Sequence, residues 1–146
     1  MRFWDASAVV PLLIEQKRTG AARRLHGADP EMAVWWGTTV ECHSAIARML
    51  RQQAIDRNGA AQGMERLRDI GSEWLEVEPS TRIRNEACRL LLAHPLRAAD
   101  ALQLAAVLDL SHEIGDRMQM ICFDDRLVEA ARFEHLPVVA HEKGVD

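Results

Sequence analysis

Apolar residues occur along the chain in two patterns, as short compact runs and as longer segments with helical spacing. The compact runs predict strands at residues 2–4, 32–36, 75–79, 118–123 and 136–140. The longer segments predict helices at residues 8–15, 19–25, 37–50, 64–74, 80–93, 97–110 and 124–133. The first of these helices contains Pro11, which a helix tolerates near its first turn. Asn58-Gly59 predicts a turn.

Strands and helices alternate in this order along the whole chain. The alternation predicts an α/β fold, a three-layer α/β/α sandwich with a mainly parallel central sheet. The length suits one domain, which we expect to span residues 1–146. Ligands of such sheets bind beyond the C-terminal ends of the strands. The residues that follow the strands are therefore the first candidates for a site.

Composition narrows the class of protein. Of the 146 residues, 48% are hydrophobic and 27% are charged, as in an ordinary globular protein. No uncharged stretch approaches the roughly 20 apolar residues of a membrane span. Asp5 lies where the apolar core of a signal peptide would be, which argues against a signal peptide. Cys42, Cys88 and Cys122 are odd in number and form no Cys-x-x-Cys pair, which argues against a disulfide framework or a zinc site. We expect a cytoplasmic protein with free thiols and no membrane association.

Net charge excludes one further class. At −4 the chain is not an obviously basic nucleic-acid binder.

Four acidic residues lie where this fold would form such a site. Asp5 ends the first strand, Glu41 lies in the first turn of the helix after the second strand, and Asp124 follows the fourth strand. Because parallel strands end at the same edge of a sheet, we expect these three carboxylates to share that edge. Asp100 lies near the start of the helix at 97–110 and could join them from there.

Three of these acids also have a structural explanation. Asp5 and Asp124 suit the N-cap position of a helix. Glu41 completes a capping box with Thr38. Each of the three would be explained by helix capping if it stood alone.

Asp100 has a weaker structural explanation. Alanine and leucine surround it in "LRAADALQLA", residues 96–105. A carboxylate on so apolar a segment is costly unless it is protonated or paired with a cation. Arg97, three residues earlier, could be that cation, or it could reach a phosphate of a substrate.

The four acids together point to a metal. Converging carboxylates repel each other and raise each other's pKa, and a divalent cation removes that repulsion. Oxygen-only ligands suit Mg²⁺ or Mn²⁺, which bind through a few carboxylates and substrate phosphates. Such ions activate water and stabilise the leaving oxygen of a phosphodiester. The residues thus favour metal-dependent phosphoryl transfer.

Four segments of the chain match one known family. They are the opening "FWDASAVVPLLIEQ", then "TTVECHSAIAR", then "LRAADALQLAAVL", and the closing "ICFDDRLVEAARFEHLPVV". The third is the most specific, because it resembles an Arg-x-x-Asp-Ala-Leu-His-Leu-Ala helix. Together they resemble the PIN-domain nucleases, and among them the VapC-type toxins of bacterial type II toxin–antitoxin pairs. The resemblance spans nearly the whole chain.

This resemblance carries expectations about the site and the function. The family's metal-binding acids carry over to Asp5, Glu41, Asp100 and Asp124, and Ser7 matches its small hydroxyl residue near the first acid. The resemblance implies a PIN-like α/β/α fold and an endoribonuclease in which Mg²⁺ or Mn²⁺ activates a water to cleave RNA. It also implies a homodimer, neutralised as a toxin by a cognate antitoxin protein.

Three positions depart from the family pattern. Cys122 stands where Thr is common two residues before the last acid, and a thiol is a poorer hydrogen-bond donor. Asp125 replaces a common basic residue, so the fourth acid is Asp124 or Asp125. Gln103 replaces the usual His, and its place one turn after the third acid suggests a supporting role at most.

A second class of function is a PIN-like partner-binding module with weak or no nuclease activity. Trp35, Trp36 and Trp74 could form a dimer or antitoxin surface, since tryptophan is enriched at interfaces, although core packing explains tryptophans more often. Two other enzyme classes fit poorly. Haloacid-dehalogenase-like phosphatases need an Asp where this chain has Ser7, and no histidine stands in a nucleophile-elbow context. His43 fits a plain helix position better than a catalytic base.

Overall fold

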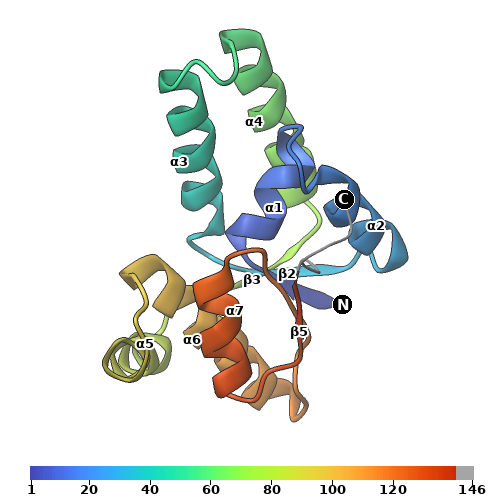
Figure 1. Ribbon diagram of the computed structural model, residues 1–146. Coiled ribbons are helices and arrows are strands. Elements are labelled where there is room, and N and C mark those ends of the chain that lie inside the picture. The colour runs from blue at the N-terminus through green and yellow to red at the C-terminus, as the bar shows by residue number, and fades with distance from the viewer. Residues whose placement is uncertain (141–146) are drawn as a thin grey trace.

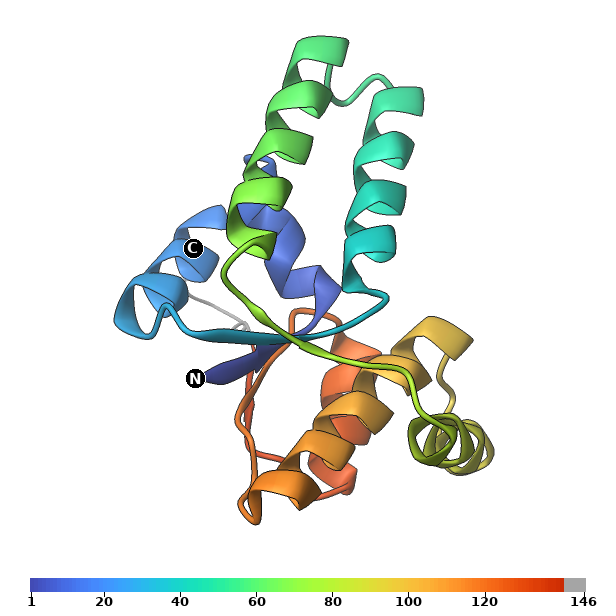
Figure 2. The same ribbon diagram turned by 180° about the vertical axis from the view of Figure 1, so that it is seen from behind.

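A parallel sheet lies between two layers of helices in the computed structural model, which describes residues 1–140 (Figures 1 and 2). Its five described strands follow the order β3-β2-β1-β4-β5, and every neighbouring pair is parallel. The strands are β1 (Arg2–Trp4), β2 (Met32–Trp35), β3 (Leu75–Val77), β4 (Met120–Ile121) and β5 (Val138–Val139). The predicted α/β/α sandwich is confirmed, and its sheet is parallel throughout the described residues.

Side chains alternate across the sheet and so define the two layers. In β2, Met32 and Val34 belong to one core cluster, whereas Ala33 and Trp35 belong to the other. The first cluster packs under the helices α1 (Ala6–Leu13), α2 (Thr19–Ala28), α3 (Thr38–Arg51) and α4 (Arg57–Gly71). The second packs under α5 (Thr81–Ala93), α6 (Ala98–Ile114) and α7 (Asp125–Phe133).

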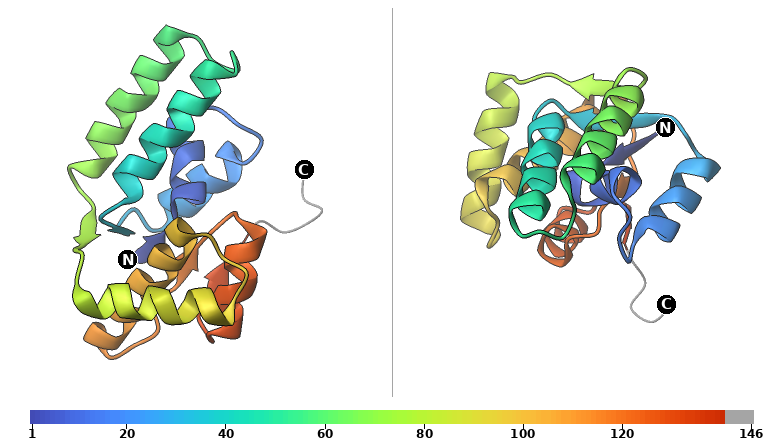
Figure 3. Two further views of the ribbon diagram at one scale, coloured as in Figure 1. Left: turned by 90° about the vertical axis from the view of Figure 1, so that its left-hand side faces the viewer. Right: turned by 90° about the horizontal axis from the view of Figure 1, so that it is seen from above.

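The helices α3 and α4 form a hairpin that stands away from the sheet (Figures 1 and 3). The base of α3 packs against α1, so one long face of α3 extends from the sheet edge outward. Side chains on that face of α3 can therefore project toward α1 beside the edge of the sheet. None of the helices described in residues 1–140 has the length and apolarity needed to cross a membrane.

Two of the predicted element boundaries are wrong near glycine and proline. Asn58-Gly59 lies inside the first turn of α4, where Asp56 is the N-cap and accepts a 2.7 Å hydrogen bond from the Gly59 amide. A side-chain cap made this pair helical although its composition favours a turn. The first helix begins at Ala6, because Asp5 caps it, and Pro11 consequently lies in the helix interior.

The other differences concern where elements end. The helix predicted to end at Leu110 continues to Ile114 and stops at Gly115, whose φ of 69° is the left-handed conformation that glycine adopts readily. Trp36 lies beyond the end of β2. The last two strands are shorter than their apolar runs, with two residues each. Apolar character there reflects burial in the core clusters on both sides of the sheet more than strand length.

Candidate active site

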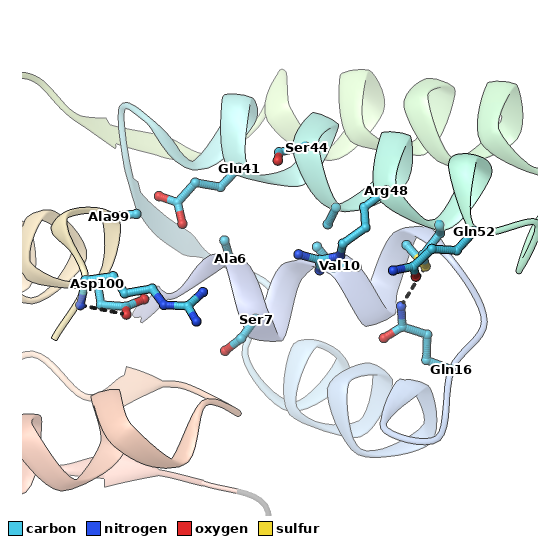
Figure 4. A pocket seen from close by; sticks show the side chains of 13 residues that line it. Ala6, Ser7, Val10, Gln16, Glu41, Ser44, Arg48, Gln52, Ala99 and Asp100 are labelled. Atoms are coloured by element: carbon cyan, nitrogen blue, oxygen red, sulfur yellow. Dashed lines mark hydrogen bonds between the residues drawn. The ribbon is translucent and has the colours of Figure 1, made fainter. Parts of the chain in front are cut away.

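Four acids from distant parts of the sequence lie at one edge of the sheet. Asp5 directly follows β1, Glu41 is in the first turn of α3 after β2, and Asp124 follows β4. Since these strands are parallel neighbours, their C-terminal ends open to the same edge. Asp100 comes from the first turn of α6. A pocket of about 580 Å³ opens here, and Figure 4 shows Glu41 and Asp100 facing it from opposite sides.

Asp5 is the most buried of the four acids, with 3% of its surface exposed. Its carboxylate accepts a 2.9 Å hydrogen bond from the backbone N–H of Ser7 and a further one from the Ser7 hydroxyl, so it caps α1 as predicted. Burial nevertheless raises the pKa of Asp5 to about 6, with a further increase from the nearby Asp100 charge. Capping explains the position of Asp5 but leaves the carboxylate poorly solvated.

Glu41 does not form the predicted capping box. The N-cap of α3 is Gly37, because β2 ends at Trp35 and the helix already begins at Thr38. The Glu41 carboxylate instead accepts a 3.1 Å hydrogen bond from Nε2 of Gln103. Burial raises the pKa of Glu41 to about 7, and the charges of neighbouring acids contribute in the same direction. The structural explanation for Glu41 is therefore lost.

Gln103 links two helices beneath the site. Its fully buried amide also donates a 3.0 Å hydrogen bond to Oγ1 of Thr38. Its Oε1 is buried without a hydrogen-bond partner among residues 1–140. The sequence suggested a supporting role from the one-turn spacing after Asp100, and the contact with Glu41 makes that role specific.

Asp100 is half-buried and lies beside the other acids. Its Oδ2 accepts a 3.4 Å hydrogen bond from the backbone N–H of Arg97. Burial and the charge of Asp124 raise the pKa of Asp100, whereas the charges of Arg97 and Arg126 oppose the rise. Arg97 thus contacts Asp100 through its backbone and affects it through its charge.

Asp124 and Asp125 occupy different environments. Asp124 is half-buried and caps α7, accepting a 3.0 Å hydrogen bond from the Leu127 amide. Its charge acts on Asp100. Asp125 is exposed at the first position of α7. Of the two alternatives for a fourth acid, Asp124 is the one whose charge reaches another of the acids, Asp100.

Cys122 and Ser7 lie between the end of β4 and Asp5 and contact both. The Cys122 thiol is buried and lies 3.6 Å from Oδ2 of Asp5 and 3.7 Å from the Ser7 hydroxyl. The Ser7 hydroxyl also accepts a 2.9 Å hydrogen bond from the Phe123 amide. Ser7 therefore fixes both the carboxylate of Asp5 and the end of β4.

The acidic oxygens suit a hard cation in chemistry, although they are not gathered around one point. Among residues 1–140, no three side chains of His, Cys, Asp or Glu stand close enough to form a ready-made metal site. The raised pKa values of Asp5, Glu41 and Asp100 arise partly from mutual repulsion. A divalent cation would remove that repulsion, and carboxylate oxygens are the ligands that Mg²⁺ and Mn²⁺ prefer.

His43 and the tryptophans, which the alternative functions would use, lie outside the acidic site. His43 is exposed, and its Nδ1 lies 2.9 Å from the Thr39 carbonyl of its own helix, in agreement with a plain helix position. Trp35 is buried in the core, Trp74 is half-buried, and Trp36 is 50% exposed. Only Trp36 of the three therefore offers a large exposed indole.

Several solved structures share the fold of this chain, and a toxin and a toxin–antitoxin complex are among them. VapC20 of Mycobacterium tuberculosis, a sarcin–ricin loop cleaving toxin, has a TM-score of 0.65 at 17% identity, with 88% of this chain and 93% of that chain covered. A toxin–antitoxin complex from Klebsiella pneumoniae has a TM-score of 0.63 at 18% identity, covering 95% and 96%. FitAcB from Neisseria gonorrhoeae has a TM-score of 0.64 at 15% identity, covering 94% and 96%.

These likenesses show that the chain has the PIN-like fold of VapC-type toxins. No protein-family model and no curated protein sequence matches the chain. At such low identities the shared feature is the arrangement of the backbone. The chemistry must be argued from the residues of this chain.

Proposed function

We propose that this protein is a divalent-metal-dependent endoribonuclease that acts as the toxin of a toxin–antitoxin pair. The observation that carries the proposal is the placement of Asp5, Glu41, Asp100 and Asp124 at one edge of a parallel sheet, where the charges of these acids act on one another. Repulsion and burial together keep the pKa values of Asp5, Glu41 and Asp100 high. Burying carboxylates that repel each other costs stability, and such strongly shifted pKa values are the pattern expected of a functional site.

The four acids would hold Mg²⁺ or Mn²⁺. When bound, the ion supplies a Lewis acid that activates water and offsets charge on a phosphodiester. The ligand role of Glu41 requires one carboxylate oxygen to remain available, and the single hydrogen bond from Gln103 engages Oε1 only.

Neighbouring residues would hold the acids in place. Ser7 donates to Asp5 from both its amide and its hydroxyl and so fixes the orientation of that carboxylate. Arg97 steadies Asp100 through its backbone N–H, and its guanidinium lines the pocket where a substrate phosphate would lie. Asp125, exposed beside Asp124, is a supporting residue.

The proposal includes partners and a compartment. The likeness to toxin–antitoxin complexes supports a cognate antitoxin as partner and RNA as substrate. A homodimer follows from the same family resemblance. The cysteines Cys42, Cys88 and Cys122 are all free thiols, which supports action in a reducing cytoplasm.

The alternative is a partner-binding module with weak or no nuclease activity. Two observations favour it, namely the half-exposed Trp36 and the separation of the acids in the described residues. Tryptophan is enriched in protein interfaces. In that case the pocket would bind a partner protein and not a metal ion.

Calorimetric titration with Mn²⁺ separates the two functions. The enzyme proposal predicts binding by the wild type and a clear loss of affinity in Asp5→Asn, Glu41→Gln, Asp100→Asn and Asp124→Asn. Asp125→Asn serves as the matched control, because its exposed carboxylate lies next to the cluster. Wild-type protein that binds no Mn²⁺, or variants that all bind like the wild type, would favour the binding module.

A further inference from the structure

The pocket at the acids continues along one face of α3. Glu41, Ser44, Arg48 and Gln52 all line it, and their spacing of three or four residues places them on the same side of the helix. Figure 4 shows this row, with Asp100 near its Glu41 end and Gln16 near its Gln52 end. The pocket therefore has an acidic end at the sheet edge and a second end toward the tip of the hairpin.

The second end carries a positive charge. Arg48 is exposed toward the pocket, and its lining neighbours Ser44 and Gln52 are neutral and polar. Gln16 is neutral too, and one N–H of its amide donates a 3.2 Å hydrogen bond to Sδ of Met49. The helix rises about 10 Å over the seven residues between Glu41 and Arg48, so their charged groups do not form a direct ion pair.

Arg48 has no acidic partner, as is the case for most arginines in residues 1–140, although some arginines are paired. Arg23 pairs with Glu15 at 2.9 Å, and Arg89 pairs with Glu134 at 2.8 Å. Within residues 1–140, Arg48 forms neither an ion pair nor a side-chain hydrogen bond. Its guanidinium is thus available to an anion that enters the pocket.

We propose that Arg48, with the amides of Gln16 and Gln52, forms a subsite for a backbone phosphate of single-stranded RNA. The subsite would hold a phosphate adjacent along the strand to the one at the acids, and this inference rests on the proposed function. A guanidinium fork binds two phosphate oxygens at once, and neutral amides can add hydrogen bonds without repelling the anion. Such a contact supplies affinity and register and no base specificity.

The matched control for Arg48 lies on the same helix. Arg51 is exposed and belongs to α3, but its side chain does not line the pocket. Arg48→Ala and Arg51→Ala therefore remove the same charge from the same helix at different places. Arg48→Lys keeps the charge and removes the fork.

Binding of a fluorescein-labelled single-stranded RNA of mixed sequence, followed by anisotropy in EDTA at several salt concentrations, tests the subsite. We expect Arg48→Ala to weaken binding roughly three- to tenfold, as one lost charge-assisted contact would. The slope of log affinity against log salt should fall by about 0.7 for one lost phosphate contact on a single strand. Arg51→Ala should change neither quantity, and Arg48→Lys should keep most of the slope.

Two outcomes would overturn the subsite. Equal losses in Arg48→Ala and Arg51→Ala would indicate general attraction by the helix. Unchanged RNA binding in Arg48→Ala would show that Arg48 makes no phosphate contact. If that variant instead lost binding to an acidic protein partner, this end of the pocket would be a protein-binding site. Failure of the proposed function is distinguishable, because wild-type protein would then bind RNA through Arg48 and cleave none.

Discussion

Nε2 of Gln103 donates a 3.1 Å hydrogen bond to Oε1 of Glu41 and so connects α6 to the acidic end of the pocket. The same nitrogen donates to Thr38, while the buried Oε1 of Gln103 has no partner in residues 1–140. An unsatisfied buried acceptor costs about 1–3 kcal/mol. Gln103 is therefore better explained as a residue that positions Glu41 than as one that stabilises the fold.

Replacing Gln103 by leucine should weaken metal binding with little effect on folding. We expect Gln103→Leu to bind Mn²⁺ about 10–100-fold more weakly, as is typical when a residue that orients a metal ligand is lost. The free energy of unfolding should change by less than about 1 kcal/mol, since the unpaired Oε1 is removed together with the donor. Calorimetry and urea unfolding measure the two quantities separately.

Gln52→Leu is the matched control, because Gln52 also lines the pocket but lies near its other end. Its affinity for Mn²⁺ should equal that of the wild type. A Gln103→Leu variant that is destabilised yet binds Mn²⁺ normally would show that Gln103 is a structural residue only.

Stability of the metal-free protein should depend on the ionisation of Asp5. Its pKa is about 6 in the fold, against an ordinary value of 3.8, because burial disfavours the charged form. The folded state therefore holds this proton more tightly than the unfolded state, and stability falls as pH rises from about 4 to about 6. Above that range the ionised carboxylate costs on the order of 3 kcal/mol. We expect Asp5→Asn to be more stable than the wild type at pH 7 by up to that amount.

Urea unfolding in EDTA at pH 4 and pH 7 measures this difference. The advantage of Asp5→Asn should disappear at pH 4, where the wild-type carboxyl is largely protonated in the fold. Asp56→Asn is the control, since Asp56 caps α4 from an exposed position, away from the other acids. An Asp5→Asn variant that is less stable than the wild type at pH 7 would contradict the picture of a strained, poorly solvated carboxylate.

Cys122→Ser should make Asp5 easier to ionise. The thiol lies 3.6 Å from Oδ2 of Asp5, and a hydroxyl in its place is a stronger donor to a carboxylate. We expect the pKa of Asp5 to fall below about 6, and Mn²⁺ binding to extend to lower pH accordingly. The carboxyl carbon chemical shift of Asp5, followed by NMR against pH, reports the change directly.

Cys42→Ser makes the same replacement at another buried thiol, which has no hydrogen-bond partner within residues 1–140. The pKa of Asp5 should stay at its wild-type value in that variant. If both variants shifted the pKa of Asp5 equally, or if Cys122→Ser left it unchanged, the thiol contact would not help to determine that pKa.

Local patterns in the sequence predict the layers and the edge at which the acids lie. Asp5 and Asp124 follow apolar runs directly, so the parallel topology alone places them at one edge. The apolar surroundings of Asp100 suggest a weak structural explanation, but its hydrogen bond from the Arg97 amide shows that it also helps to cap α6. These predictions need only the order of elements and the rule that parallel strands end together.

Contacts between elements are harder to predict. Whether Glu41 caps its helix or meets Gln103 depends on where β2 ends and on how α3 packs against the start of α6. The availability of Arg48 likewise depends on which acids lie near it in space. Periodicity reports which face a residue occupies, and it does not report which side chain of another element lies opposite.

Cleavage of total bacterial RNA by the wild type and by Asp100→Asn, with Mg²⁺, with Mn²⁺ and with EDTA, tests the metal-dependent nuclease most directly. We predict cleavage by the wild type with either metal and none in EDTA. Asp100→Asn should retain its helical content by circular dichroism and lose at least about a hundredfold in rate, as when one charged group of a preorganised site is removed. Wild-type cleavage that persists in EDTA, or an Asp100→Asn variant that cleaves at the wild-type rate, would contradict the proposed function.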